Sequence, residues 1–156
     1  MAGREVTADP SPSPFWRRFL RLQYALVRRF DPLARQLYLC GLLGITGELT
    51  VAGRRTGRLQ SVLLGILIVD GRGYVGHPNG PVDWSRNLAA SGRGWLALPG
   101  AAAREVRAVP LPPGPERTAA IVATARQQPF PGNVVYRLAR RHILAVGDYF
   151  RLDEPD

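Results

Sequence analysis

Three arginines stand close together in one short, glycine-bounded loop of this 156-residue chain. The loop, flanked by stretches of strand-forming composition, reads Gly53-Arg54-Arg55-Thr56-Gly57-Arg58. Glycines permit the positive φ angles of a tight turn, and guanidinium groups bind phosphate or carboxylate through paired hydrogen bonds. The pattern indicates an anion-binding hairpin, although a solvated hairpin tip would have the same composition.

A second segment leaves a predicted strand at Gly76-His77 and enters a predicted helix at Asp83. Its turn, Pro78-Asn79-Gly80-Pro81, exposes backbone N–H groups beside a helix N-terminus, which suits an anion or the polar edge of a ring. In the helix, Trp84 and Leu88 are four residues apart and are expected to pack inward. Asn87 lies between them and is expected to cap or bridge the loop.

The elements that must position these residues are short strands and amphipathic helices. Strands are expected at 48–52, 59–69, 74–76, 94–98, 102–109 and 143–152, the last interrupted by Gly147. Helices are expected at 15–30, 32–39, 83–90, 116–127 and 133–141. The unbroken apolar run at 62–69 indicates a strand that is buried on both faces or crosses a barrel. Because the strand pairs lack crossover helices, the predicted fold is α+β, a small antiparallel barrel with peripheral helices.

Composition bounds the class of protein. With 46% hydrophobic and 21% charged residues, the chain is expected to be globular, with a disordered tail at 1–14, a helical segment at 15–40 and the barrel domain at 41–152. The first 14 residues are polar and carry three prolines, so no secretory signal is expected. The single cysteine, Cys40, is compatible with a reducing cytoplasm.

The net charge of +9 favours anionic partners, and all 21 basic residues are arginine. The predicted helix 15–30 is amphipathic, with Phe15, Phe19, Leu22, Leu26 and Phe30 on one side and five arginines on the other. Two interpretations stay open: the apolar stripe packs on the barrel, or it lies on an anionic membrane. Nucleic-acid binding is disfavoured, since aromatic and basic residues do not interleave on the strands.

Other kinds of site find little support in the sequence. Two histidines, His77 and His142, and one cysteine do not make a convincing metal site, so none is expected. The chain also lacks a Gly-x-Ser-x-Gly nucleophile motif and a glycine-rich dinucleotide loop.

Taken together, the two segments resemble a known family. Gly53-Arg54-Arg55-Thr56-Gly57, followed by Pro81-x-x-Trp84-x-x-Asn87-Leu88, is similar to the motifs of the deazaflavin-dependent nitroreductases, and the resemblance covers about residues 30–152. It implies a split β-barrel and a reduced 8-hydroxy-5-deazaflavin coenzyme (F-420) as hydride donor. Flavin mononucleotide is the alternative cofactor, and the family includes both monomers and homodimers.

The resemblance also implies roles for individual residues. The phosphate region would be held by Arg54, Arg55, Thr56 and Gly57, with Gln60 standing where the family usually has a basic residue and Arg58 as its substitute. The ring would be bordered by His77, Asn79 and Gly80, and the pocket wall would be shaped by Trp84, Asn87 and Leu88. Gly76 and His77 replace the usual Ser and Lys. Of the pocket tyrosines, Tyr136 is left, and either it or water is expected to donate a proton.

An oxidoreductase is therefore the leading hypothesis. A deazaflavin carries the hydride itself, so the protein need supply only orientation, electrostatics and a proton. Expected acceptors are quinones, nitroaromatics or other apolar conjugated compounds, because the predicted pocket walls are apolar and aromatic. The expected location is the cytoplasm, with peripheral contact at the inner face of the cell membrane. The alternative is a non-catalytic split-barrel carrier of a flavin-like, tetrapyrrole or lipid ligand.

Overall fold

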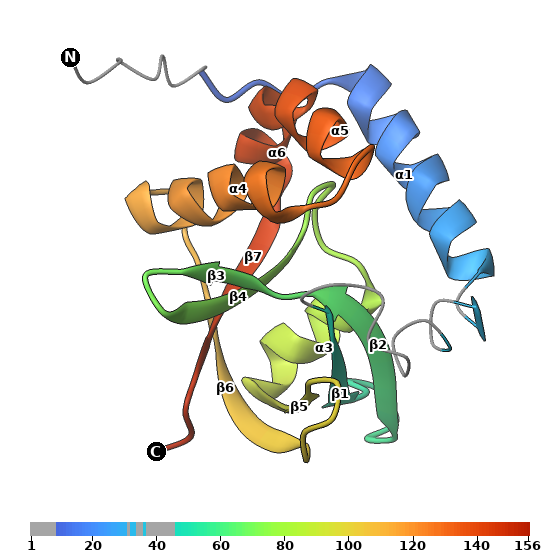
Figure 1. Ribbon diagram of the computed structural model, residues 1–156, viewed down its shortest axis with the longest axis vertical. Helices are drawn as coiled ribbons and strands as arrows, with labels where there is room; N and C mark the ends of the chain where they lie inside the picture. Colours follow the sequence, from blue (N-terminus) through green and yellow to red (C-terminus); the bar gives the residue numbers. More distant parts are fainter. Residues whose placement is uncertain (1–8, 31, 34–35, 37–45) are drawn as a thin grey trace.

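The computed structural model has an antiparallel sheet at its centre (Figure 1). It describes residues 9–30, 32–33, 36 and 46–156. In this part of the chain, the sheet has seven strands in the order β2-β1-β5-β6-β7-β4-β3, and five helices lie around it. The predicted α+β class is confirmed.

The strands are short, and every neighbouring pair is antiparallel. They are β1 (Thr46–Ala52), β2 (Leu59–Gly65), β3 (Leu67–Val69), β4 (Arg72–His77), β5 (Arg93–Ala97), β6 (Arg104–Pro110) and β7 (Asp148–Asp153). β2 and β3 stand at opposite edges of the strand order, yet only Ile66 separates them in the sequence. The sheet must therefore curl until its two edges come together, which makes an open barrel.

The single strand expected at 59–69 is wrong. β2 ends at Gly65, Ile66 points into the barrel with 4% exposure, and β3 begins at Leu67. Burial on both faces is wrong as well, because β2 is an edge strand whose residues are exposed or half-buried. The other alternative, that residues 62–69 cross the barrel, agrees with the structure, because this segment carries the chain from one edge of the sheet to the other.

The helices begin and end at residues with recognisable capping chemistry. They are α1 (Pro14–Arg29), α3 (Asp83–Ser91), α4 (Pro115–Gln127), α5 (Gly132–Leu138) and α6 (Arg140–Val146). At the start of α1, the Ser13 hydroxyl accepts a hydrogen bond from the Trp16 N–H, and Pro14 occupies the first helical position. α3 ends at Gly92, which has a φ of +70°.

Two predictions at the C-terminal end are wrong. The helix expected at 133–141 is two short helices, α5 and α6, which meet at Ala139. Residues 143–146, expected to begin the last strand, form the second half of α6. The apolar side chains of this segment pack against α4 and not in the sheet. β7 begins only after Gly147, where the helix ends.

Some predictions lie outside the described residues. These are most of the helix expected at 32–39, Cys40, and the first eight residues of the tail expected at 1–14. The described end of that tail is bonded to α6, because the Ser11 N–H donates to the Arg141 carbonyl at 3.0 Å. The division into a tail, a helical segment and a barrel domain stays a prediction.

Two hydrophobic clusters share β7. Phe150 faces the barrel interior, where it packs with Leu49, Val75 and Leu88. Its neighbour Tyr149 points the opposite way, into a second cluster formed with α4 and α6. Figure 1 shows α4, α5 and α6 gathered over one end of the sheet, while α1 runs along one side of the molecule. β7 is therefore covered on both faces.

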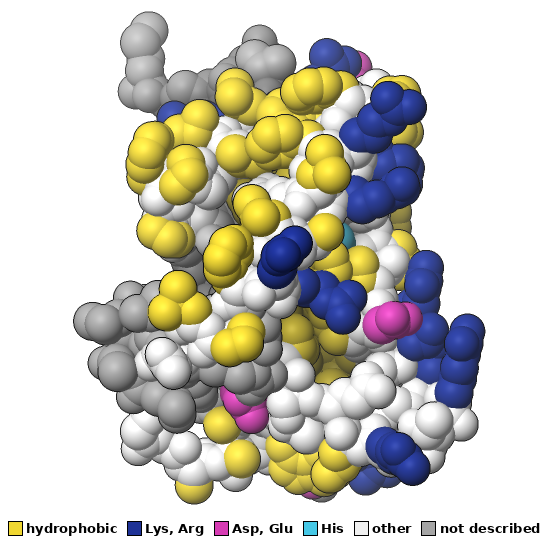
Figure 2. Space-filling model, turned by 90° about the vertical axis from the view of Figure 1, so that its right-hand side faces the viewer, with side chains coloured by type: hydrophobic (Ala, Val, Ile, Leu, Met, Phe, Trp, Pro, Cys, Tyr) yellow, Lys and Arg dark blue, Asp and Glu magenta, His cyan; other side chains and the backbone are white. Residues whose placement is uncertain are grey.

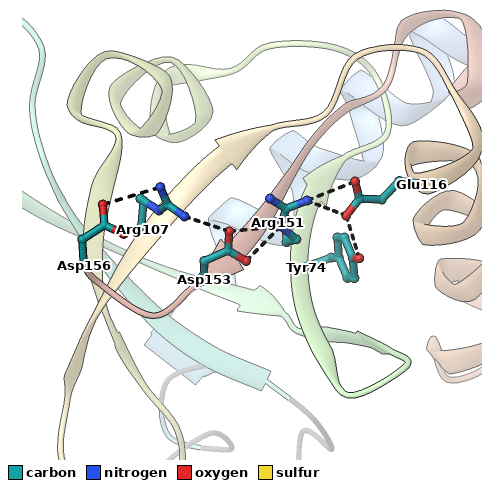
Figure 3. Close-up of polar contacts among 6 residues, drawn as sticks. All are labelled: Tyr74, Arg107, Glu116, Arg151, Asp153 and Asp156. Atoms are coloured by element: carbon teal, nitrogen blue, oxygen red, sulfur yellow. Dashed lines mark hydrogen bonds and ion pairs between the residues drawn. The ribbon is translucent and has the colours of Figure 1, made fainter.

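A chain of charged side chains fastens α4 to the sheet (Figure 3). Arg151 on β7 donates from Nη1 to both carboxylate oxygens of Glu116 on α4, at 2.9 and 3.1 Å. The Tyr74 hydroxyl donates to the same carboxylate at 3.0 Å, and Arg151 Nε donates to Asp153 Oδ1 at 2.9 Å. The hydrogen bonds from Arg151 hold the pKa values of Glu116 and Asp153 below their usual range.

We expect Glu116→Gln to lower the free energy of unfolding at neutral pH by about 1 kcal/mol, since the pair is partly exposed and screened by solvent. A carboxyl with a lowered folded-state pKa stabilises the protein above its unfolded pKa and loses that contribution as the pH falls. Denaturant unfolding between about pH 6 and pH 3 should therefore show a weaker acid dependence in the variant. Glu105→Gln, which removes a 3.6 Å pair with Arg93, is the matched control and should change little. Equal effects of the two variants would contradict the fastening role.

Candidate functional site

The arginine hairpin and the start of α3 are joined by one side chain, that of Asn87. Its Oδ1 accepts from the Arg54 backbone N–H at 3.2 Å and from Arg54 Nη1 at 2.8 Å. Its Nδ2 donates to Gln60 Oε1 on β2 at 3.2 Å. Asn87 is 4% exposed, so these bonds are made away from bulk water. Asn87 thus ties the arginine hairpin to α3, whereas the sequence predicted that it caps or bridges the turn before the helix.

Arg54 is engaged within the protein. Its guanidinium donates to the Asp83 carboxylate at 3.2 Å and to the Asp83 carbonyl at 3.4 Å. Beside it, a hollow of about 190 Å³ is lined by Gly53, Arg54, Arg55, Thr56, Gln60, Asp83 and Asn87. Gly57 and Arg58 lie outside this lining, and Gly57 supplies the turn with a φ of +69°. Arg55 therefore brings a charge to this hollow that Asp83 does not already pair.

A second, deeper cavity lies on the other side of the first turn of α3. Its volume is about 260 Å³, and its walls come from α1, β2, β4, α3, α4, α5 and β7. Three residues predicted for the site line it: His77, Trp84 and Tyr136. Both hollows adjoin α3, through Trp84 in one case and through Asp83 and Asn87 in the other. A single elongated ligand could thus contact both.

Three further predicted site residues, Leu88, Gly80 and Asn79, line neither hollow. Leu88 is fully buried in the barrel core, as its spacing predicted, and reaches neither hollow. Gly80 is buried with a φ of +93°, a conformation that favours glycine. Asn79 links three segments: its N–H approaches His77 Nδ1 at 3.3 Å, its Oδ1 meets His142 Nε2 at 2.8 Å, and its Nδ2 donates to the Arg17 carbonyl at 3.0 Å.

Tyr149 is a cavity residue that sequence reasoning missed. Its ring lies across Gly76 on the neighbouring strand β4, and a Cβ built on Gly76 would come within 2.3 Å of the ring. A Cβ on Gly147 would meet the same ring at 2.9 Å. Glycine at position 76 thus makes room for the Tyr149 ring. The sequence contains Gly76, Gly147 and Tyr149, but the contact between Gly76 and Tyr149 follows from the register of β4 against β7, which the sequence alone did not give.

The inward face of α1 was also missed. Leu20, Gln23, Tyr24 and Val27 form one cavity wall and follow the i, i+3, i+4, i+7 spacing of a single helix face. The more apolar stripe that the sequence singled out points elsewhere: Leu22 is 72% exposed and Phe15 is 65% exposed. Packing of that stripe on the barrel is therefore wrong for the described residues.

Burial opposes the charged forms of the polar groups in this cavity. Burial raises the pKa of Tyr136 to about 12, although the residue as a whole is only half-buried. Burial also raises the pKa of Tyr149, whose hydroxyl lies 3.4 Å from that of Thr124. Desolvation lowers the pKa of His77 below its usual value. The cavity is thus apolar, with neutral hydrogen-bonding groups on its walls.

One buried donor on the cavity wall lacks a partner. Trp84 Nε1–H is inaccessible to water and finds no hydrogen-bond acceptor in the part of the chain that the structure describes. Such a group is costly unless a ligand acceptor satisfies it. Because Trp84 Nε1 is inaccessible to water, a ligand acceptor could reach it only after the indole or its neighbours move. For a metal, the described residues offer no group of three or more His, Cys, Asp or Glu side chains.

A larger and shallower hollow, of about 880 Å³, lies over α4 and β3. It contains none of the predicted site residues, and its floor is made chiefly by α4 side chains such as Ala119 and Val122. The volume of a hollow is therefore not a guide to where the candidate functional site lies.

The sequence matches no protein-family model, and no curated protein matches it. Solved structures do resemble it. An F420-H2 dependent reductase (FDR-A) has 16% identity and a TM-score of 0.56, over 70% of this chain and 95% of that one. HutZ, the heme storage protein from Vibrio cholerae, has 14% identity and a TM-score of 0.53, over 81% and 91%. A protein described as a domain-swapped dimer has 16% identity and a TM-score of 0.55, over 84% and 98%.

This chain has the split-barrel fold. The predicted split β-barrel is thereby confirmed, with the curled sheet described above as its core. The neighbours differ in what they bind, and identities of 14–16% show the fold alone.

We expect the stability of the protein to fall as the pH drops below about 6.5. His142 is 1% exposed, and its Nδ1 accepts from the Ser13 N–H at 3.0 Å, so its Nε2–H must donate to Asn79. Burial and the nearby Arg17 lower the pKa of His142, so the unfolded chain binds a proton more readily than the folded one. His77 has a lowered pKa too and adds to this effect.

His142→Gln can keep the bond to Asn79 but does not ionise. Its unfolding free energy should be about 1–2 kcal/mol lower at neutral pH, with a shallower decline toward acid that leaves the part due to His77. Urea unfolding between about pH 7.5 and pH 5 measures both. An undiminished decline in the variant would show that His142 is not the source.

Proposed function

We propose that this protein is an oxidoreductase that binds reduced 8-hydroxy-5-deazaflavin coenzyme across the first turn of α3 and transfers its hydride to an apolar conjugated acceptor. The observation that carries the proposal is the joining of two hollows by α3. One is basic and lies beside Arg55, and the other, which is partly enclosed and lined more by apolar than by polar groups, lies beside Trp84. A coenzyme with a flat ring and an anionic phosphate tail has the matching two-part chemistry.

The basic hollow would hold the phosphate region. Arg55 and Thr56 are exposed at its rim, and Gln60 and Asn87 add amide groups. Arg54 would act mainly by position, because it already bonds Asp83 and Asn87 and so holds the hairpin against α3. Arg58 is exposed on the same hairpin and would extend the positive field toward the tail.

The enclosed cavity would hold the ring. Its volume of about 260 Å³ lies just below the roughly 300–1,000 Å³ of small-molecule pockets, so it suits the ring portion of a larger ligand. His77, Trp84 and Tyr149 line it, and the unpaired Trp84 N–H would donate to a ring carbonyl. The coenzyme supplies the hydride; the chain orients it and excludes water.

Tyr136 is proposed as the catalytic hydrogen-bond donor. Because its pKa is about 12, it stays protonated at neutral pH and can polarise an acceptor carbonyl. Quinones, nitroaromatics and related conjugated compounds are the proposed acceptors, since the remaining cavity walls are apolar and aromatic. Flavin mononucleotide is the second choice of cofactor.

A carrier is the second candidate function, and the heme storage protein among the structural neighbours supports it. The same cavity could bind a flavin-like or tetrapyrrole ligand without turnover. Oxidation of reduced coenzyme by menadione, followed through the coenzyme absorbance, separates the two functions. Binding without oxidation would favour the carrier.

Peripheral contact with an anionic membrane is proposed from α1. This helix turns Leu20 and Tyr24 toward the cavity, while Phe15, Leu22 and Leu26 stay on the surface. Figure 2 shows this side of the molecule, with hydrophobic side chains gathered over one part and arginines along its border. An apolar stripe bordered by arginine is the pattern of an interfacial helix. No helix in the described residues is long and apolar enough to span a bilayer.

We expect Arg55→Ala to weaken binding of the oxidised deazaflavin coenzyme about tenfold, because it removes one charge-assisted contact to an anion. Arg104→Ala removes the same charge from an exposed site on β6 and should leave affinity within about twofold. Fluorescence titration measures both. Wild-type protein should bind the deazaflavin coenzyme more tightly than flavin mononucleotide. Equal losses in the two variants would reduce the hairpin to a source of general positive charge.

We expect the protein to co-sediment with anionic vesicles and to be released by salt, since each basic residue near such a surface contributes about 1 kcal/mol. Leu22→Glu places a charge on the exposed stripe of α1 and should abolish sedimentation without lowering the melting temperature. Leu59→Glu is the matched control: Leu59 is 64% exposed and lies on β2, away from α1. Sedimentation of both variants alike would exclude the α1 stripe as the contact.

A further inference from the structure

We propose that His77 is the proton-exchange group of the enclosed cavity: it delivers a proton from Nε2 to an acceptor that has received a hydride. The inference rests on the proposed function for its reaction, but its structural part concerns the free protein. It also gives His77 and Tyr136 different roles, with the tyrosine polarising the acceptor and the histidine supplying the proton.

The position of the His77 ring is set by its Nδ1. This nitrogen lies 3.0 Å from the Gly80 carbonyl oxygen and 3.3 Å from the Asn79 backbone nitrogen. A carbonyl at the shorter distance requires a hydrogen on Nδ1, so the Nδ1–H form is favoured. Nε2 is then the nitrogen on the far side of the ring from the loop, and His77 lines the cavity.

Protonation of His77 leaves the bond from Nδ1 to Gly80 intact, whereas the Asn79 N–H, which could bond only to an Nδ1 without a hydrogen, is not bonded to the ring in either state. Nδ1 carries a hydrogen in the neutral Nδ1–H form and in the cation alike, so the bond to Gly80 persists in both. Only Nε2 changes, which is the ring nitrogen that makes no bond to the loop. The loop thus holds the ring in one orientation while leaving it free to gain and lose a proton.

His142 provides the contrast within the same chain. Its Nδ1 accepts from Ser13 and its Nε2–H donates to Asn79, so a second proton would abolish the bond to Ser13. His142 is therefore held neutral by its partners, while His77 is not. Of the two histidines in the chain, His142 has the hydrogen bonds of a structural group, and His77 has those of a group that can titrate.

The surroundings of His77 limit which other group could supply the proton. Tyr24 of α1 meets the ring edge-on, with centroids 4.8 Å apart, and its pKa is raised by burial. Tyr136 and Tyr149 share the cavity and also hold their protons. Asp148, opposite His77 on β7, favours the charged imidazole, whereas desolvation opposes it. Among the described groups of this cavity, His77 is the one that ionises nearest neutrality.

The step balances with a quinone as acceptor. When bound, the coenzyme would supply a hydride with its electron pair, which would convert the quinone to a hydroquinone monoanion, and the oxidised coenzyme would release its remaining ring proton to solvent. The anionic oxygen then takes the hydrogen from Nε2 of the His77 imidazolium, which returns to neutral imidazole. Solvent reprotonates His77 before the next turnover. A positioned acid of this kind contributes roughly 100-fold or more.

The first test uses the free protein. Imidazole ¹⁵N and ¹³C spectra should show two histidines, and His77→Gln assigns them by removing one set of signals. We expect His77 to be the Nδ1–H form at high pH and to titrate at Nε2, while His142 stays in the Nε2–H form to lower pH. A Nε2–H form of neutral His77, or no titration above the pH of acid unfolding, would overturn the proposal.

The second test uses turnover with menadione. His77→Gln should lower kcat by about 100-fold and remove the decline of activity that wild type shows as the pH rises, while coenzyme affinity changes less than about threefold. An unchanged kcat and pH profile in the variant would overturn the role of His77. If wild type itself binds no coenzyme or gives no turnover, the proposed function fails. The titration of the free protein still tests whether His77 is the Nδ1–H form and gains its proton at Nε2.

Discussion

The hydrogen bonds of Asn87 are the contact on which the proposed site depends. Through them the arginine hairpin between β1 and β2 is held against α3, so a loop that could move freely becomes one side of a defined hollow. Asn87 itself is 4% exposed, so competition from water at its amide is weak and leaving the amide unpaired would be costly. The guanidinium of Arg54 is already bonded to Asn87 and Asp83, so it mainly holds the hairpin in place. Arg55 is therefore the arginine best placed to bind an anion in the hollow.

A second constraint shapes the enclosed cavity. β7 is covered on both faces, so Tyr149 and Phe150 are both buried although they point in opposite directions. The Tyr149 ring can lie against β4 only because Gly76 carries no side chain. Glycine at position 76 thereby gives the cavity an aromatic wall, next to His77.

Much of this arrangement could be predicted from the sequence. Period-two and period-3.6 patterns located most strands and helices, and the four-residue spacing of Trp84 and Leu88 predicted that both pack inward. The orientation of α1 could not be predicted in this way, because hydrophobicity selects its Phe15 and Leu22 side while the cavity uses Gln23 and Tyr24. The strand expected at 143–146 failed for a related reason: a short apolar run does not distinguish a buried helix from a strand.

The central claim is that one ligand spans both hollows over the first turn of α3, and a crystal structure with oxidised deazaflavin coenzyme tests it most directly. The account predicts the ring between His77 and Trp84, with the Trp84 N–H donating to a ring carbonyl, and the phosphate within hydrogen-bonding distance of Arg55. A coenzyme bound in the groove over α4, or a ring that leaves the Trp84 N–H unpaired and the hairpin empty, would contradict it.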